Sequence, residues 1–252
     1  MILRRLAAAV KRQDWFVVLI EFLIVVAGIF VGLQVNNWAE ENAERAAEHA
    51  ALERLFLEAQ NAYAIVSIRL ERAQRFNQTR RNAVAFLDSA TPLPENTLPI
   101  KIGINALAQF PPVTFSSVAY DELTSSGQMQ LIQSGEIRDL VSSFHVDIDR
   151  LNSLQEMFGD GGHEYWAAYR RNVFWRYNPD ATGTDILLST FDWDAMRQDR
   201  DFITIAIGAL RNQIVIEDFL VSIVADAKAM CDQLGDAVER ECSGEDGQRV
   251  DP

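Results

Sequence analysis

The sequence predicts an all-α protein in which one N-terminal transmembrane helix continues into a long helix and an antiparallel helical bundle. Three observations lead to this prediction: an apolar stretch of 21 residues from Trp15 to Val35, a chain without proline from Met1 to Thr91, and no period-2 alternation long enough for a convincing sheet. The mean hydropathy of −0.05 averages this apolar stretch with a polar remainder. The total therefore conceals two different kinds of chain.

The charge is divided in the same way. Of the formal net charge of −13, residues 1–14 carry +3 and Glu21 carries −1, which leaves −15 for the residues that follow. A domain this acidic repels phosphate backbones, so no nucleic acid is expected as a partner. The two cysteines are too few for a disulfide scaffold or a four-ligand zinc site.

These features divide the chain into six expected segments. They are a cytoplasmic basic segment at 1–14, a transmembrane helix at 15–35, a membrane-proximal long helix at 36–88, a proline-containing connector at 89–114, a helical bundle at 115–240 and a disordered acidic tail at 241–252. The part that follows the membrane segment is long enough for one ordinary core or two small ones.

The stretch from Trp15 to Val35 is long enough to cross a bilayer. At about 1.5 Å per residue it spans roughly the 30 Å hydrocarbon core, and Trp15 and Trp38 lie where indoles favour the two membrane interfaces. No small-x-small cleavage site ends the run, so an uncleaved signal anchor is expected. The bases of residues 1–14 and the acids after Trp38 predict a cytoplasmic N-terminus and a large domain on the other side.

One face of this helix carries its unusual residues. Gly28 and Gly32 form a G-x-x-x-G pair, and Glu21 falls within about 40° of both on the helical wheel. Glycines at this spacing let a second helix approach closely, and a carboxyl group beside them can hydrogen-bond a partner. The pattern predicts packing with a second copy or with another membrane protein. The alternative is a chance G-x-x-x-G pair with a Glu21 that snorkels to the nearby boundary.

The helix is expected to continue past the membrane to Asp88. Its apolar residues recur in steps of four and three, as in a coiled coil or a long bundle helix. They are Leu52, Phe56, Ala59, Tyr63, Val66, Leu70 and Ala73. The apolar seam weakens at Asn77 and Arg80 and resumes at Val84 and Leu87.

Glycines and a cap divide the chain after the connector. Gly127 suits the left-handed end of a short helix, and Ser134 can cap a helix that runs to about Phe158. The Gly-Asp-Gly-Gly segment at 159–162 is expected to break this helix, and a further helix is expected at 163–177.

Residues 4–5 (Arg-Arg), 13–18 (Gln-Asp-Trp-Phe-Val-Val) and 24–38, a G-x-x-x-G span that ends in Asn-Asn-Trp, form one recognisable pattern. Residues 120–132, with a Glu-Leu-x-x-Ser-Gly core, form a second. Together they resemble a bacterial family of single-pass membrane proteins of unknown function, although Asp14 stands where that family more usually has asparagine. The resemblance implies a single-pass bacterial membrane protein and no known activity. Together with the orientation expected from the charges, it places the protein in the bacterial inner membrane with a periplasmic C-terminal domain, as an expectation.

Few residues suggest chemistry. His145 and Asp149 lie four residues apart on an expected helix, but a catalytic zinc site needs a third protein ligand, so a solvated helix face is the expected role. His163 and Glu164 lack the second histidine of a zincin motif. We therefore expect no catalytic residue, no metal site, no cofactor and no enzymatic activity.

A segment rich in aromatic residues and arginine, from Tyr165 to Tyr177, is the most unusual feature outside the membrane. Its candidate interaction surface consists of Trp166, Arg170, Arg171, Trp175 and Arg176, a composition favoured at protein interfaces and lipid headgroups. The residues expected to face the core are Trp166, Tyr169, Val173 and Tyr177. Ordinary bundle packing, with arginine stems covering apolar surface, is the alternative.

A last long helix, capped by Asp194 or Asp201, is expected to contain both cysteines. Cys231 and Cys242 are eleven residues apart, so on an unbroken helix they lie roughly 16 Å apart and cannot bridge. A disulfide between them requires the chain to fold back after about Val238. An interchain bond and two free thiols are the other possibilities.

These observations favour a non-enzymatic assembly, scaffold or accessory subunit that acts through helix–helix contacts. Its expected partners are the lipid bilayer and either a second copy or another membrane protein. The alternative is a sensor-like periplasmic ligand-binding module. The 14 residues before the membrane leave no room for an output domain, so such a module would signal through a partner.

Overall fold

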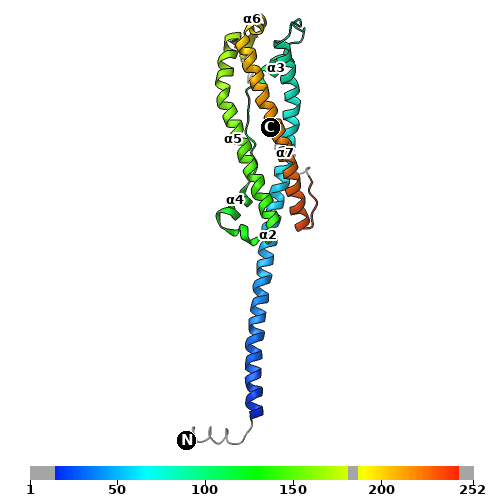
Figure 1. Cartoon of the computed structure of the whole chain (residues 1–252), viewed down its shortest axis with the longest axis vertical. Helices are drawn as coiled ribbons and strands as arrows, with labels where there is room; N and C mark the ends of the chain where they lie inside the picture. The colour runs from blue at the N-terminus through cyan, green and yellow to red at the C-terminus, as the bar shows by residue number, and fades with distance from the viewer. Residues whose placement is uncertain (1–14, 181–186, 244–252) are drawn as a thin grey trace. The chain divides into compact units, whose positions relative to one another are not determined.

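The computed structural model describes residues 15–180 and 187–243 (Figure 1). The basic segment expected at 1–14 lies outside these residues, as does most of the tail expected at 241–252. An apolar N-terminal helix continues into a helical bundle, and one small hairpin is added to it. The predicted fold class is confirmed.

The elements follow one another in a simple order. They are α2 (Trp15–Leu87), α3 (Leu98–Ala106), α4 (Val118–Ser125), the 3-10 helix η1 (Gln128–Leu131), α5 (Gly135–Asn172), β1 (Val173–Tyr177), β2 (Leu187–Phe191), α6 (Trp193–Gln198) and α7 (Arg200–Ala237). The chain forms two compact units, unit 1 up to Ala51 and unit 2 from Leu52 onward.

Unit 1, in its described part, is the N-terminal portion of α2. The most apolar 18-residue window of this helix has a mean hydropathy of 2.1, and none of it is buried. Within the described residues, α2 is the one helix that is long and apolar enough to cross a membrane.

Unit 2 is built on three long helices. The C-terminal portion of α2 and the whole of α5 run in the same direction, and α7 runs back between them in the opposite direction (Figure 1). The segment between α3 and α4 returns the chain along the bundle, which allows α2 and α5 to be parallel. The apolar seam of α2 lies inside this bundle: Leu52, Phe56, Ala59, Val66, Val84 and Leu87 are all buried.

The short helix α3 packs closely against α2. A Cβ atom at Gly103 would lie 2.6 Å from the Cβ of Ala83, so only glycine fits this crossing without a shift of backbone. Beyond it, a core cluster fills the end of unit 2 where α2 ends and α7 begins. Its largest fully buried members are Leu87, Ile104, Leu107, Tyr165, Tyr169, Met196 and Phe202.

Two boundaries that the sequence predicts in α5 are wrong. The helix runs unbroken through 159–162, where Gly162 is buried and its Cβ position lies 3.6 Å from the Cβ of Ala108. Packing of the long helix outweighs the helix-propensity cost of about 1 kcal/mol per glycine. Residues 173–177 are a strand, not a helix, and pair antiparallel with β2 from Val173–Phe191 to Tyr177–Leu187. The β-branched and aromatic side chains of β1 favour this conformation.

The predicted caps are partly correct. Ser134 caps α5, and its side chain accepts a hydrogen bond from the N–H of Ile137. The last helix is capped by Asp199, and Asp194 and Asp201 lie instead in the first turns of α6 and α7. Acidic residues suit both positions, which is why the sequence alone does not single out the cap.

The C-terminal end of α7 turns back on itself. The turn includes Glu239 at φ 57°, and the N–H of Arg240 donates to the carbonyl of Gly235 at 2.8 Å. A Cβ atom at Gly235 would lie 2.4 Å from the carbonyl oxygen of Arg240, so the turn requires glycine there. This reversal brings Cys231 and Cys242 together in a disulfide, with their Cα atoms 5.6 Å apart.

Candidate functional site

The face of α2 that was singled out from sequence is fully available in unit 1. Glu21, Gly28 and Gly32 are all exposed, and apart from the neighbouring part of the same helix no described atom lies within 4 Å of the Cβ position of either glycine. Trp15 and Trp38 are 69% and 65% exposed. Two small residues and a carboxyl group on one open face allow a second helix to approach closely and to hydrogen-bond.

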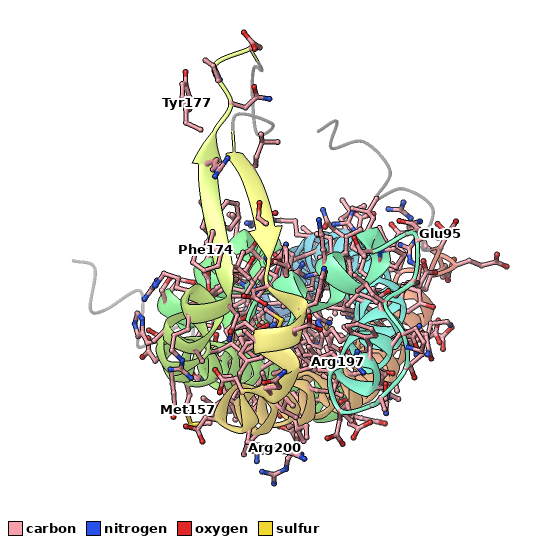
Figure 2. The ribbon with its side chains drawn as sticks, turned by 90° about the horizontal axis from the view of Figure 1, so that it is seen from above. Glu95, Met157, Phe174, Tyr177, Arg197 and Arg200 are labelled. Carbon is pink, nitrogen blue, oxygen red and sulfur yellow. A yellow bond between two sulfur atoms is a disulfide. The ribbon has the colours of Figure 1, made fainter. Side chains whose placement is uncertain are left out.

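The structure separates the residues of the aromatic segment. Tyr169 and Val173 are buried as predicted, and Trp166 is half-buried, with its ring 5.3 Å from that of Tyr169. Tyr177 was expected in the core and is 70% exposed, because β1 leaves the helices and carries it to the tip of the hairpin (Figure 2). The helical pattern failed at this point because the chain is a strand there.

The candidate interaction surface of this segment is consequently divided between two elements. Trp166, Arg170 and Arg171 lie on α5, whereas Trp175 and Arg176 lie on β1. Arg171 pairs with Asp199, with Nη2 3.1 Å from Oδ2. The arginines and Trp175 are exposed, but the five side chains share no single helix face.

His145 does not lie on a solvated face as the sequence suggested. Its ring stacks on Tyr120 with 3.7 Å between ring centroids, and its Nδ1 lies 2.8 Å from the carbonyl oxygen of Val141. Its Nε2 lies 3.7 Å from Oε1 of Glu58. Within the described residues, no three His, Cys, Asp or Glu side chains lie close enough to hold a metal ion.

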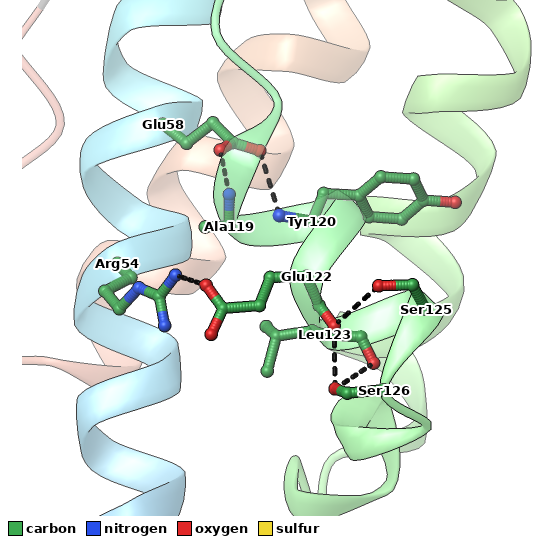
Figure 3. A network of polar contacts seen from close by, with 8 residues as sticks. All are labelled: Arg54, Glu58, Ala119, Tyr120, Glu122, Leu123, Ser125 and Ser126. Atoms are coloured by element: carbon green, nitrogen blue, oxygen red, sulfur yellow. Dashed lines mark hydrogen bonds and ion pairs between the residues drawn. The ribbon is translucent and has the colours of Figure 1, made fainter.

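Glu58 caps a helix that lacks a cap of its own. Its carboxylate accepts hydrogen bonds from the N–H groups of Ala119 and Tyr120, at 2.8 and 3.4 Å (Figure 3). Ser117, the residue before α4, makes no side-chain cap bond. At the other end of α4 the hydroxyl of Ser126 donates to the carbonyl of Glu122 at 2.7 Å, a capping role that fits the expected helix end.

The most unexpected polar residues lie inside unit 2, beside the last residue of α3, Ala106, and the non-helical segment 107–113 that follows it. This segment passes between the long helices, where its carbonyl groups need donors. Side chains supply them: Arg80 donates to Ala106, Gln213 to Leu107 and Gln109, Arg69 to Pro111 and Pro112, and Gln155 to Pro111.

Asn77 joins α2 to α7 at the same level. Its amide donates to the carbonyl of Gln213 at 3.1 Å and to Glu217 at 2.6 Å, and it accepts from Nη1 of Arg80 at 2.8 Å. Burial lowers the pKa of Arg80 to about 10. The negative charge of Glu217 acts in the other direction and raises this pKa, but by less. The interruption of the apolar seam at Asn77 and Arg80 is the sequence signal for this network, although a break in period does not by itself predict a buried polar site.

Comparison with models of protein families, with curated proteins and with solved structures finds no match to this chain.

Proposed function

We propose that this chain is a single-pass inner-membrane protein with a periplasmic helical domain, and that it acts as a non-enzymatic assembly, scaffold or accessory subunit. The observation that carries the proposal is the exposed apolar surface of α2, a window with mean hydropathy 2.1 and no burial. Lipid and neighbouring helices are the two environments that would cover such a surface. The resemblance to a bacterial membrane family points the same way.

The packing face of α2, which carries Glu21, Gly28 and Gly32, favours contact with a second protein helix over contact with lipid. Gly28 and Gly32 permit close approach of a second helix, while Glu21 on the same side provides a polar contact that hydrocarbon cannot satisfy. Polar groups within a membrane are costly without a partner. This combination favours a second protein helix on that face, from another copy or from another membrane protein.

The expected orientation agrees with the chemistry of unit 2. The bases of residues 1–14 favour a cytoplasmic N-terminus. The disulfide between Cys231 and Cys242 is of the kind that persists in oxidising compartments such as the periplasm. An alkaline phosphatase fusion after residue 243 is expected to be active, and an inactive fusion would contradict the orientation.

The assembly is tested by native purification in a mild detergent, followed by mass measurement of the complex. The double variant Gly28→Leu and Gly32→Leu fills the packing face and is expected to dissociate the complex. Val26→Leu, roughly 140° around the helix from Glu21, is the matched control and should leave the complex intact. A monomer in the unsubstituted protein, or a complex that survives the double variant, contradicts the proposal.

A further inference from the structure

A small cavity opens on the side of unit 2 beside the polar network. Its volume is about 180 Å³. It is lined by α2, α5, α7 and residues between 106 and 111. The apolar part of the lining includes Phe76, Phe110 and Leu220. Phe76 is 43% exposed, so one side of the cavity meets solvent.

The cavity is cationic in a chain that is otherwise acidic. Arg69, Arg72 and Arg80 line it, and no carboxylate is among the lining residues. In the described part of the chain none of the three makes an ion pair within 4.0 Å. The pKa of Arg69 is lowered by burial and then by the neighbouring charge of Arg72. Because the positive charges of Arg69 and Arg72 repel each other, binding of an anion between them is favoured.

Two buried side chains at the cavity have polar atoms left over. Gln155 is 5% exposed; its amide nitrogen donates to Pro111, but its Oε1 has no hydrogen-bond partner among the described residues. Arg80 is 6% exposed and uses Nε and Nη1 for Ala106 and Asn77. Its Nη2 donates to no group in the part of the chain that the structure describes. The wall of the cavity thus contains an unpaired acceptor, itself covered in this structure, beside cationic donors.

We propose that this cavity binds a small organic acid with an apolar body and a hydroxyl group. The arginines would hold the carboxylate, the phenylalanines the apolar body, and Oε1 of Gln155 the hydroxyl. An apolar cavity of about 150 Å³ holds one benzene molecule, which sets the size of the ligand near that of a hydroxybenzoate. The site lies wholly in unit 2 and does not depend on the assembly proposed above.

Calorimetric titration of the full chain in detergent tests the site with 4-hydroxybenzoate as the probe. Saturable binding is expected, and benzyl alcohol, which has no charge, should bind at least about tenfold more weakly, as loss of a charge-assisted hydrogen bond implies. Inorganic phosphate, which has no apolar body, should also bind more weakly. No binding of the probe, or equal binding of either comparison compound, overturns the proposal.

A pair of arginine variants separates the cavity from general surface charge. Arg72→Gln removes a lining charge and should weaken binding of 4-hydroxybenzoate about tenfold. Arg75→Gln removes an exposed charge on the same helix outside the lining and should leave the affinity unchanged. Equal weakening by both variants would mean a diffuse electrostatic attraction and would overturn the site.

Discussion

Two stretches of α2 within unit 2 bury different kinds of side chain. From Leu52 to Val66 the helix buries an apolar seam, with Phe56 and Val66 0% exposed. From Ala73 to Leu87 it buries Asn77 and Arg80 at the positions where that seam is interrupted. A break in the apolar period therefore does not mean that the helix face has left the core. It means that the face meets something polar.

The polar partner is the end of α3 at Ala106 together with the segment 107–113, which belongs to no helix or strand. A helix or strand satisfies its carbonyl groups internally, whereas this segment passes between helices and depends on side chains from all three. Asn152 of α5 bonds both the N–H and the carbonyl of Val113, at 2.9 and 3.1 Å. The burial of Arg80, Gln155 and Gln213 is thus explained by the chain segment whose carbonyl groups they bond.

The largest expected effect is in the apolar stretch. Phe56→Ala removes a fully buried ring and should lower the free energy of unfolding by about 3 to 5 kcal/mol. Guanidinium unfolding of the full chain in detergent, followed by circular dichroism, measures it. Leu57→Ala, at a position that is 51% exposed on the same helix, is the control and should change little. Equal effects would mean that the seam has been misassigned.

The disulfide supports the same stretch from the C-terminal side. Arg240, in the turn that the disulfide closes, places its guanidinium 4.9 Å from the ring centre of Phe56. Replacing Cys231 and Cys242 by serine opens a loop of about 11 residues, which should cost about 3 kcal/mol in unfolding experiments. The sequence contains no other cysteine, so a reductant should destabilise the unsubstituted protein alone. Equal sensitivity of both proteins would contradict this.

The polar stretch should respond less strongly and for another reason. Asn77→Ala leaves Nη1 of Arg80 without its acceptor and removes donors to Gln213 and Glu217, at a cost of about 2 kcal/mol in the free energy of unfolding. The same denaturation experiment measures it. Asn82→Ala, on the exposed side of α2, should stay within about 0.5 kcal/mol. A neutral Asn77→Ala would show that water replaces the network.

The apolar stretch could be predicted from the sequence, whereas the buried polar stretch could not. Apolar period and length were enough for the membrane-spanning candidate, the seam of α2, the first part of α5 and the long α7. They could not predict that the proline-containing segment would lie inside the bundle, because nothing in its own sequence reports which side chains will satisfy its carbonyls. The buried roles of Asn77, Arg80, Gln155 and Gln213 followed from that placement.

Local signals failed where packing or pairing decides. The glycines at 159–162 look like a break, yet the helix continues because both flanks are packed along α7. The aromatic residues up to Tyr169 have helical spacing, and the sequence prediction extended this helix to residue 177. Residues 173–177 are a strand because they pair with β2. The sequence allowed a disulfide between Cys231 and Cys242 only if the chain folds back after about Val238. The structure has a turn there, and it brings the two cysteines together.

The smallest expected effect is at the start of α7, where Asp199 accepts hydrogen bonds from the N–H of Phe202 and from the side chains of Asn172 and Arg171. Burial raises the pKa of Asp199, but these three partners together lower it below its usual value. A lowered folded-state pKa means that the carboxylate stabilises the fold above the unfolded-state pKa of about 3.9, and that this contribution is lost as the pH falls through the lowered value.

Asp199→Ala should therefore cost about 1 kcal/mol of unfolding free energy at neutral pH, as loss of a helix cap does. The difference from the unsubstituted protein should shrink below a pH of about 3.9. Asp201→Ala, in the first turn of the same helix, is the matched control, because its position was an equally good cap by sequence but makes no cap bond. If the two variants lose equal stability at neutral pH, the general charge near the helix N-terminus, and not the cap at Asp199, fixes the start of α7.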